Sequence, residues 1–521
     1  MNVRTGSRRF GRAEARPYIV LGAYLLLALL VTPVYPHFPS PNEVARWLLA
    51  AALVEDHSVE VTRFVPIVGP RMEDLAEVDG RLYANKAPGS ALLGLPAYLA
   101  MRPFVGPPSG HNLRMMLTAM RLIASTLPTL LLGLLFLRLA REQQVADDRV
   151  ALVVFLLLFA TPLFPCGLLL VSHAPGAMAL FGAWCFLFQR ERNAWMAGAL
   201  LGIAVLSEYA LVFPAAILVL AIAFQRDWRG LGKTVAAGLP FAIVLGAYQR
   251  AAFGGVLEFA FGKDTLPAFR TLGNSGMFGI GFPSLELGLK LILSPERGLI
   301  VFSPFLLLVA PAFVYARKRL EPAAWWSLLL VPIALLVLYA GYPNWHGGWN
   351  VGPRYLVPAL PFLVAPMLFS AKLDLRIAAM LGGWSFLAVF LTSIVFPFPP
   401  NLFPFPWMSF SMPLLGSGLI APNVFHFVAR PLAIAVPLLL GAFVITFVLR
   451  KNVAYAFIGM LLAIVVGSLA PRLASQKLMA LQRSYVAEVY FEQKGALTES
   501  TPGLERRKAV ELALPPESWP F

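Results

Sequence analysis

Residues able to do acid–base chemistry are concentrated in one polar segment near the N-terminus, positions 36–113. A carboxylate such as Glu43, close to the start of this segment, can take a proton from a hydroxyl group. Glu43 also fits a structural role, because Ser40, Pro41 and Glu43 have the spacing of a capping box at a helix start. The two roles are compatible, so both stay open. The ionisable side chains of the segment include Glu43, Arg46, Glu55, Asp56, His57, Glu60, Arg63, Glu73, Asp74, Asp79 and Lys86.

A second group of candidates is the sequence Tyr83-Ala84-Asn85-Lys86-Ala87-Pro88-Gly89. A lysine just before a Pro-Gly turn at a membrane interface can neutralise a lipid phosphate. It can equally be an ordinary interfacial lysine whose aliphatic stem lies along apolar groups. Lys86 is therefore a candidate for binding phosphate, and Tyr83 is a candidate for binding substrate.

A third candidate is Arg297, in the sequence Leu293-Ser294-Pro295-Glu296-Arg297-Gly298-Leu299. It lies where an apolar stretch begins, so its charge is available to an anion at the membrane surface. Pairing with the adjacent Glu296 would explain the same arginine without any ligand.

The fourth group lies between Tyr342 and Tyr355 and joins aromatic rings to polar side chains. Trp345 and Trp349 offer flat faces to a sugar, although anchoring at the membrane interface explains tryptophans equally well. That anchoring does not explain the polar residues that accompany them, which are His346, Asn350 and Arg354. Ser172-His173 and Glu208 are further polar residues that we expect at the same face.

No Cys/His metal spacing, Walker loop, nucleophile elbow or dinucleotide fingerprint stands in a supporting context. The sequence therefore predicts neither a metal site nor a cofactor.

The composition determines which elements must position these residues. Of the 521 residues, 58% are hydrophobic and 13% are charged, about half the charged fraction of a soluble domain. The chain is therefore predicted to be an all-α polytopic membrane protein. Its net charge of +15 comes from arginines and lysines in short loops beside apolar stretches, which the positive-inside rule explains. We do not expect nucleic acid as a partner.

Thirteen apolar stretches are each long enough, or nearly long enough, to cross the hydrocarbon of a bilayer. A basic arm, residues 1–16, places the N-terminus in the cytoplasm, and an odd number of spans places the C-terminus outside. The predicted spans are 17–35, 114–137, 150–171, 174–189, 194–207, 209–224, 234–253, 298–316, 323–341, 355–370, 377–396, 431–449 and 453–470.

The outer segments complete the predicted domain organisation. A transmembrane domain covers 17–470 and includes the first outer loop, 36–113, and a short outer tail follows at 471–521. Within the first outer loop, 91–105 is expected to be interfacial or re-entrant. Apolar residues after Glu43 recur with helical spacing and predict a helix along the membrane surface. Cys166 and Cys185 lie inside different spans and are expected to be free thiols.

The stretches Asn42-Glu43-x-x-Arg46 and Lys86-Ala87-Pro88, together with the thirteen-span layout, resemble the C-type glycosyltransferase superfold. Its relatives include protein O-mannosyltransferases and lipid A aminoarabinose transferases. Those enzymes carry an Asp-Glu pair at the start of the first outer loop and a Lys-Pro-Pro stretch before the second span. This sequence departs from the pattern twice, because Asn42 replaces the Asp and Ala87 replaces the first Pro.

The resemblance implies a glycosyltransferase that uses a polyprenyl-phosphate sugar as donor and a lipid, glycan or protein hydroxyl as acceptor, at the outer face of a cell inner membrane. It makes Glu43 the candidate catalytic base and implies that cations stabilise the leaving phosphate. The candidate phosphate-binding residues are Lys86, Arg297 and Arg354. The candidate substrate-binding residues are Arg46, Tyr83, Trp345, His346, Trp349 and Asn350.

Three alternatives stay open, and one of them, a non-catalytic membrane scaffold, would leave the clustered outer groups unexplained. A polysaccharide polymerase or ligase would use a lipid diphosphate donor with similar outer arginines and histidines. A lipid or solute transporter would place polar residues near the bilayer midplane, whereas the predicted spans are nearly free of charge there.

Overall fold

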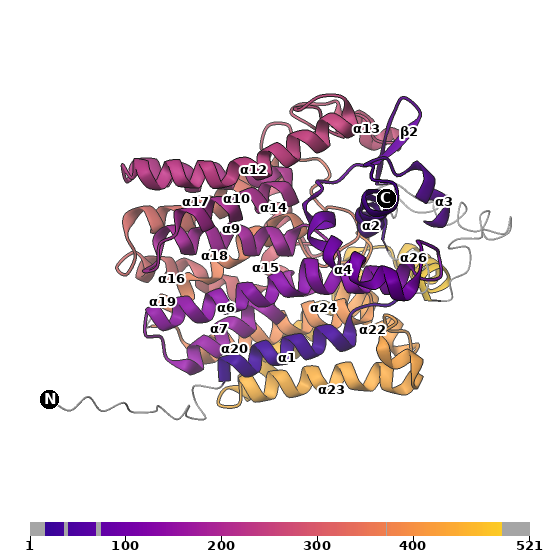
Figure 1. The fold of residues 1–521 in the computed structure, drawn as a ribbon. Helices are drawn as coiled ribbons and strands as arrows, with labels where there is room; N and C mark the ends of the chain where they lie inside the picture. The colour runs from indigo at the N-terminus through magenta and orange to yellow at the C-terminus, as the bar shows by residue number, and fades with distance from the viewer. Residues whose placement is uncertain (1–15, 36–39, 69–73, 371, 492–521) are drawn as a thin grey trace.

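The computed structural model describes residues 16–35, 40–68, 74–370 and 372–491. Figure 1 shows most helices side by side with nearly parallel axes, and the irregular segments gathered mainly at one end of this bundle. The predicted basic arm (apart from Arg16), Glu73 and the tail beyond residue 491 lie outside the described residues.

Six helical segments of the described chain are long and apolar enough to cross a membrane. They are Leu113–Glu142 (α5 and α6), Trp228–Phe253 (α12), Pro322–Ala340 (α17), Leu375–Val395 (α20 and α21), Arg430–Val448 (α23) and Val453–Leu473 (α24 and α25). Six shorter apolar helices accompany them: Arg16–Val31 (α1), His173–Phe188 (α9), Ala194–Ser207 (α10), Tyr209–Phe224 (ending in α11), Pro304–Ala316 (ending in α16) and Arg354–Phe369 (containing α18 and α19).

Twelve of the predicted spans overlap these helices, and the remaining one, 150–171, overlaps α7 (Asp147–Phe159) and α8 (Leu163–Cys166). A helix needs about 20 residues to cross the hydrocarbon, so length and composition support six crossings. The number thirteen stays a prediction. The free thiols predicted at Cys166 and Cys185 are confirmed, and both are buried.

Capping residues explain where individual helices start and end. Helix α12 begins after Asp227, whose carboxylate accepts a hydrogen bond from the Gly230 amide at 2.8 Å. It ends at Gly254, which has a φ of 92° that suits glycine at a helix C-terminus. Helix α10 ends where Glu208 adopts an extended conformation, so the chain turns sharply there before Tyr209.

A β-hairpin corrects the prediction that the chain is purely helical. Strands β1 (Leu75–Val78) and β2 (Arg81–Ala84) pair antiparallel, with Leu75 opposite Ala84. Asp79 and Gly80 make the turn with positive φ angles. The distant segment around Asp264 runs along β1, because the Thr265 amide donates to the Leu75 carbonyl at 2.9 Å. The hairpin thereby joins the segment between α1 and α5 to the loop that follows α12.

Helix α2 (Pro41–Glu55) differs from the predicted surface helix. Every residue from Glu43 to Ala52 is buried, including Trp47. The helix packs against α4 (Gly89–Val105) and α5 (Leu113–Arg121). Between Glu43 and Ala52 it carries only two charged residues, Glu43 and Arg46, and protein encloses this part of the helix, as expected for a helix without a polar face. Its predicted capping box is absent, since Ser40 makes no side-chain cap hydrogen bond.

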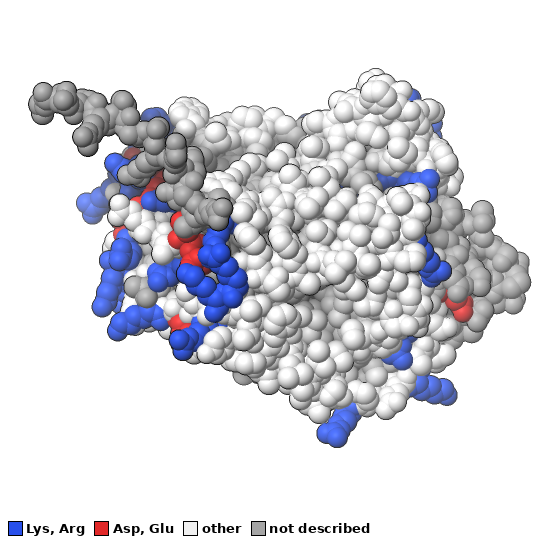
Figure 2. All heavy atoms as spheres, turned by 90° about the horizontal axis from the view of Figure 1, so that it is seen from below, with Lys and Arg blue, Asp and Glu red and all other residues white. Residues whose placement is uncertain are grey.

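Figure 2 shows a broad band without charged side chains on one face of the bundle, with lysines and arginines at its two ends. One end carries the denser cluster and includes the side from which α1 starts. The short helices α3 (Val65–Val68), α13 (Pro267–Gly273), α22 (Met412–Gly416) and α26 (Gln476–Val486) lie toward the other end, and α14 (Leu285–Leu293) and α15 (Leu299–Phe302) lie nearer the middle of the bundle.

Candidate active site

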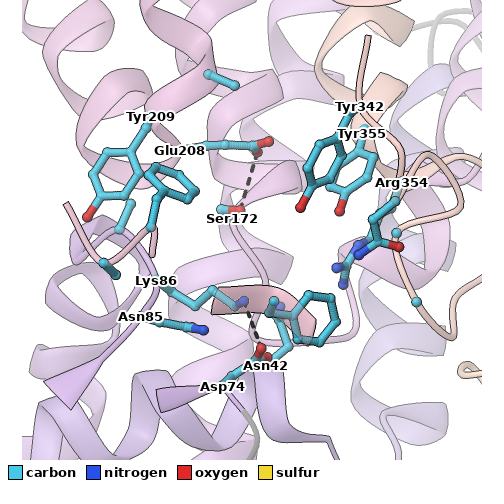
Figure 3. A pocket seen from close by; sticks show the side chains of 18 of the residues that line it. Asn42, Asp74, Asn85, Lys86, Ser172, Glu208, Tyr209, Tyr342, Arg354 and Tyr355 are labelled. Carbon is cyan, nitrogen blue, oxygen red and sulfur yellow. Dashed lines mark hydrogen bonds and ion pairs between the residues drawn. The ribbon is translucent and has the colours of Figure 1, made fainter. Parts of the chain in front are cut away.

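A cavity of about 400 Å³ lies among the segments that connect the helices. Its walls come from α2, the residues that flank the β-hairpin, the start of α9, the turn after α10, the loop after α12 and the segment from Tyr339 to Tyr355. Tyr490, in the described part of the C-terminal tail, also contributes to the wall. Figure 3 shows polar side chains from these separate segments pointing toward one another.

Three cationic side chains face this cavity: Arg46, Lys86 and Arg354. Lys86 Nζ lies 2.8 Å from Asp74 Oδ1, whereas Arg46 donates to the carbonyl oxygen of Asn42 at 2.6 Å and to its side-chain oxygen. Within the described chain, the guanidinium groups of Arg46 and Arg354 make no ion pair. The Nε atoms of both arginines are buried without a hydrogen-bond partner.

Burial lowers the pKa of Arg46 to about 10, while the charge of Asp74 opposes that shift. Arg46 therefore stays protonated at neutral pH. A buried positive charge with unsatisfied donors is unstable unless an anion approaches it. The cavity is consequently suited to bind a negatively charged group.

Asp74 and Asp264 lie at the base of the hairpin, and their pKa values are shifted in opposite directions. Burial would raise the pKa of Asp74, but the charges of Lys86, Arg354 and Arg46 hold it below its ordinary value. Burial raises the pKa of Asp264, whose carboxylate accepts from Asn85 Nδ2 at 2.6 Å and from the Leu266 amide at 3.0 Å. Asp74 is thus a partner for cations.

Glu208 occupies the turn after α10 and accepts three hydrogen bonds. Its donors are His173 Nδ1 at 2.9 Å, the Tyr339 hydroxyl at 2.9 Å and the Ser172 hydroxyl at 3.3 Å. Burial alone would raise the pKa of Glu208. His173 and the two hydroxyl groups together lower this pKa by more than burial raises it, so the net shift is downward. Gly89 allows α4 to start directly against the Leu206–Ser207 backbone, where a Cβ atom would overlap it. This close approach places Lys86 and Glu208 on one cavity.

Of the ten site residues predicted from the sequence, four line the cavity: Arg46, Lys86, Trp349 and Arg354. The other six, Glu43, Tyr83, Arg297, Trp345, His346 and Asn350, are outside its lining.

Glu43 points away from the cavity and into the protein. Its two carboxylate oxygens each lie 2.7 Å from the guanidinium of Arg121, and one also accepts from the Leu170 amide at 2.7 Å. Glu43 is fully buried and the Arg121 side chain is 2% exposed. A carboxylate enclosed by these donors cannot reach an acceptor hydroxyl, so the structure does not place Glu43 as a catalytic base. Its neighbour Asn42 faces the cavity instead.

Arg297, His346 and Asn350 form a supporting network beside the cavity. Arg297 donates to the Pro399 carbonyl at 2.6 Å and to Asn401 Oδ1 at 2.9 Å, and Asn401 Nδ2 contacts His346 Nδ1 at 2.9 Å. Asn350 Nδ2 donates to the carbonyls of His346, Gly347 and Gly348. These bonds fix the loop that carries Trp349 and Arg354 rather than binding a ligand directly.

Tyr83 and Trp345 also have partners outside the cavity. The Tyr83 ring packs edge-on against Phe253 with centroids 6.0 Å apart, and Lys290 Nζ lies 5.9 Å from the Trp345 ring centroid. Both rings therefore hold neighbouring segments together.

Sequence reasoning gave no role to several cavity residues. Asp74 and Asp264 sit among other loop carboxylates, and only the pairing of β1 with the segment around Asp264 brings them near Lys86. His173 and Glu208 were expected at this face, but their contact depends on how α9 packs against α10. Among the described residues, no three His, Cys, Asp or Glu side chains are grouped so as to hold a metal ion.

No protein-family model and no curated protein matches the sequence. Solved structures are similar in overall arrangement. ArnT from Cupriavidus metallidurans in the apo state matches with a TM-score of 0.49 and 15% identity, over 89% of this chain and 78% of that chain. The same protein bound to undecaprenyl phosphate gives a TM-score of 0.47 and 12% identity, over 91% and 79%.

An oligosaccharyltransferase from Archaeoglobus fulgidus, tethered to an acceptor peptide, matches with a TM-score of 0.42 and 14% identity. That match covers 98% of this chain and 61% of the archaeal chain. The roles assigned below come from the side chains of this chain.

Proposed function

We propose that the chain is a multi-pass membrane glycosyltransferase that moves a sugar from a polyprenyl phosphate to a hydroxyl acceptor on the non-cytoplasmic face. The observation that carries this proposal is the meeting of Arg46, Lys86 and Arg354 in one cavity, two of them without an ion pair in the described chain. Three cations around one space bind a phosphate through charge-assisted hydrogen bonds.

Part of the cavity wall is suited to a lipid. Aromatic and aliphatic side chains of the loop after α12 line it: Phe259, Phe261, Phe269, Leu272, Met277 and Phe278. Phe261, Met277 and Phe278 are also exposed at the molecular surface. An apolar wall that continues from the cavity to the surface gives the prenyl chain a place beside its phosphate.

The proposed reaction needs two things from the protein. The bond from the anomeric carbon to the phosphate breaks, and the negative charge that develops on the phosphate is stabilised by Arg46, Lys86 and Arg354. A base must take the proton of the acceptor hydroxyl as its oxygen attacks. Because a phosphate leaves readily, no proton donor to the leaving group is required.

The charge distribution supports the proposed orientation. The basic end of the bundle would face the cytoplasm by the positive-inside rule, with the N-terminus, while the cavity and the C-terminus would face outside. The location that we propose is a bacterial inner membrane.

A binding experiment tests the phosphate site without knowledge of the sugar. The probe is a polyprenyl methyl phosphodiester, which carries the single negative charge of the donor, added to the full chain in nanodiscs. Arg354→Gln is the sharpest variant, because Arg354 makes no ion pair in the described chain and its removal leaves no carboxylate unpaired. Losing a charge-assisted hydrogen bond should weaken binding roughly 10- to 100-fold.

Lys290→Met is the matched control, since Lys290 pairs with Glu286 outside the cavity. Unchanged affinity in Arg354→Gln and in Lys86→Met would contradict the proposal. Release of polyprenyl phosphate from radiolabelled polyprenyl-phosphate mannose, glucose or galactose then tests sugar transfer. A preference for polyprenyl diphosphate sugars would favour the polymerase or ligase reading.

A further inference from the structure

The base that the proposed reaction requires is not supplied by Glu43, and the cavity offers another group in its place. His173, the first residue of α9, lines the cavity together with Glu208. His173 Nδ1 lies 2.9 Å from Glu208 Oε2. An ionised carboxylate only accepts hydrogen bonds, so Nδ1 carries the hydrogen. In the neutral ring Nε2 is then the unprotonated nitrogen, able to take a proton.

Glu208 is held firmly in this role. Tyr339 donates to its other oxygen at 2.9 Å, and Ser172 donates to the oxygen shared with His173 at 3.3 Å. The Tyr339 ring stacks on Tyr355, with centroids 4.5 Å apart and planes 6° apart. Tyr355 in turn meets the His173 ring edge-on at 6.2 Å. The imidazole is therefore fixed in both tautomer and orientation, as in carboxylate–histidine pairs that act as general bases.

The other carboxylates are less suited to be the base. Asp74 is bound to Lys86, and three cations depress its pKa. Asp264 already accepts from Asn85 and from the Leu266 amide. Glu208 itself has no oxygen free of a donor. His173 Nε2 has no hydrogen-bond partner among the described residues and can receive an acceptor hydroxyl.

We propose that His173 is the catalytic base of this transferase and that Glu208 is its positioning residue. This inference rests on the proposed function. The acceptor oxygen forms a bond to the anomeric carbon while the bond from that carbon to the phosphate oxygen breaks. The electron pair stays on the phosphate, which Arg46, Lys86 and Arg354 hold. The hydroxyl proton moves to His173 Nε2, and the carboxylate of Glu208 stabilises the imidazolium.

The reactivity of His173 can be measured without any sugar. Diethyl pyrocarbonate acylates unprotonated imidazole nitrogens, and mass spectrometry of the full chain in detergent locates the product. We expect modification at His173, slower modification in Glu208→Gln, and protection by polyprenyl methyl phosphodiester, which fills the cavity. Exposed His57 is the positive control. His346 is the negative control, because it does not line the cavity and its Nδ1 accepts from the Gly348 amide. An unreactive His173 beside a modified His57 would overturn the proposal.

Transfer measurements separate catalysis from structure. With polyprenyl-phosphate mannose, glucose or galactose as donor and glycerol as acceptor, His173→Ala should lower kcat at least about 100-fold. Binding of the methyl phosphodiester should be unchanged, and added imidazole should restore part of the turnover, which no structural role predicts. Glu208→Gln should lower kcat with little effect on KM.

Asp264→Asn is the matched comparison, since it alters another carboxylate of the same cavity. Full transfer by His173→Ala, or loss of transfer in Asp264→Asn alone, would reject His173 as the base and leave the transferase standing. Failure of the wild-type chain to bind the phosphodiester would reject the proposed function instead. The diethyl pyrocarbonate experiment would still show whether the His173 ring is reactive.

Discussion

Two buried arginines show how this protein separates structural from functional charge. Arg121 on α5 is neutralised by both oxygens of Glu43, whereas Arg46 on α2 donates only to the backbone and side-chain oxygens of Asn42 in the described chain. A paired buried charge stabilises one arrangement of the fold, and an unpaired one stays available to a ligand. This difference is why we propose that the anion binds at Arg46 rather than at Arg121.

The first prediction concerns Glu43. Glu43→Gln leaves the Arg121 guanidinium buried without a counter-ion, so it should destabilise the folded chain by about 3–5 kcal/mol. Thermal unfolding in detergent should show the loss, while binding of polyprenyl methyl phosphodiester per folded molecule stays unchanged. The double variant Glu43→Leu/Arg121→Met should be more stable than either single one. A fully stable Glu43→Gln protein that has lost transfer would return Glu43 to the reaction.

The second prediction concerns pH. Burial lowers the pKa of His346 to about 4, and the charges of Arg297 and Arg354 add to this effect. An unfolded histidine titrates near about 6.5, so between these values the unfolded chain binds more protons. The stability from neutral His346 is complete above about pH 6.5 and decreases as the pH falls toward 4.

Unfolding in detergent should therefore become easier by about 1–2 kcal/mol between pH 7 and 5. His346→Gln should remove most of this dependence, and His57→Gln, at an exposed site, should not. An unaltered pH dependence in His346→Gln would show that another group titrates.

At the residue scale, the sequence predicts the positions of the cationic side chains better than those of the carboxylates. The sequence predicts Arg46, Lys86, Arg297 and Arg354 on one face, and three of them, Arg46, Lys86 and Arg354, line one cavity, whereas Arg297 does not. The choice among carboxylates is not predictable. Whether Glu43 or Asn42 faces the cavity depends on the rotation of α2, and an enclosed apolar helix shows no polar face from which to read it.

At the scale of elements, most helices follow from apolar length alone, but their contacts do not. Helices α20 (Leu375–Phe386) and α24 (Val453–Gly467) pack backbone to backbone. A Cβ atom at Gly459 would overlap the Met380 carbonyl, and one at Gly383 would overlap the Ala456 carbonyl. Small residues permit such close approach between helices in membranes. The sequence contains 41 glycines, and nothing in their spacing marks these two.

The third prediction follows from this contact. Gly459→Val should force the two helices apart and destabilise the chain by roughly 2 kcal/mol or more, as for overpacked interiors. Gly416→Val is the control, because no atom lies within 4 Å of a Cβ built there. Thermal unfolding of the two variants in detergent measures the difference. Equal stability would mean that α20 and α24 are not in direct contact.

At the scale of the whole molecule, the proposal requires that the two charged ends of the bundle face opposite sides of the bilayer. The cavity belongs to the end with the hairpin, α13 and α26, and the other end carries the denser basic cluster. A transferase that takes its donor from the outer leaflet needs those ends on opposite sides of the bilayer. The prediction holds only if the segment after α12 is outside and the loop between α16 (Val309–Ala316) and α17 is inside.

Cysteine labelling decides this. The native thiols Cys166 and Cys185 are buried, so they should give little background with a membrane-impermeant maleimide. Ser275→Cys and Arg319→Cys place exposed thiols in the two loops. In intact cells the reagent should modify the cysteine at 275 and not the one at 319, and in inverted vesicles the pattern should reverse. Equal labelling of both positions from one side would show that the cavity and the basic end face the same side of the bilayer. That result would contradict the proposed reaction at the outer face.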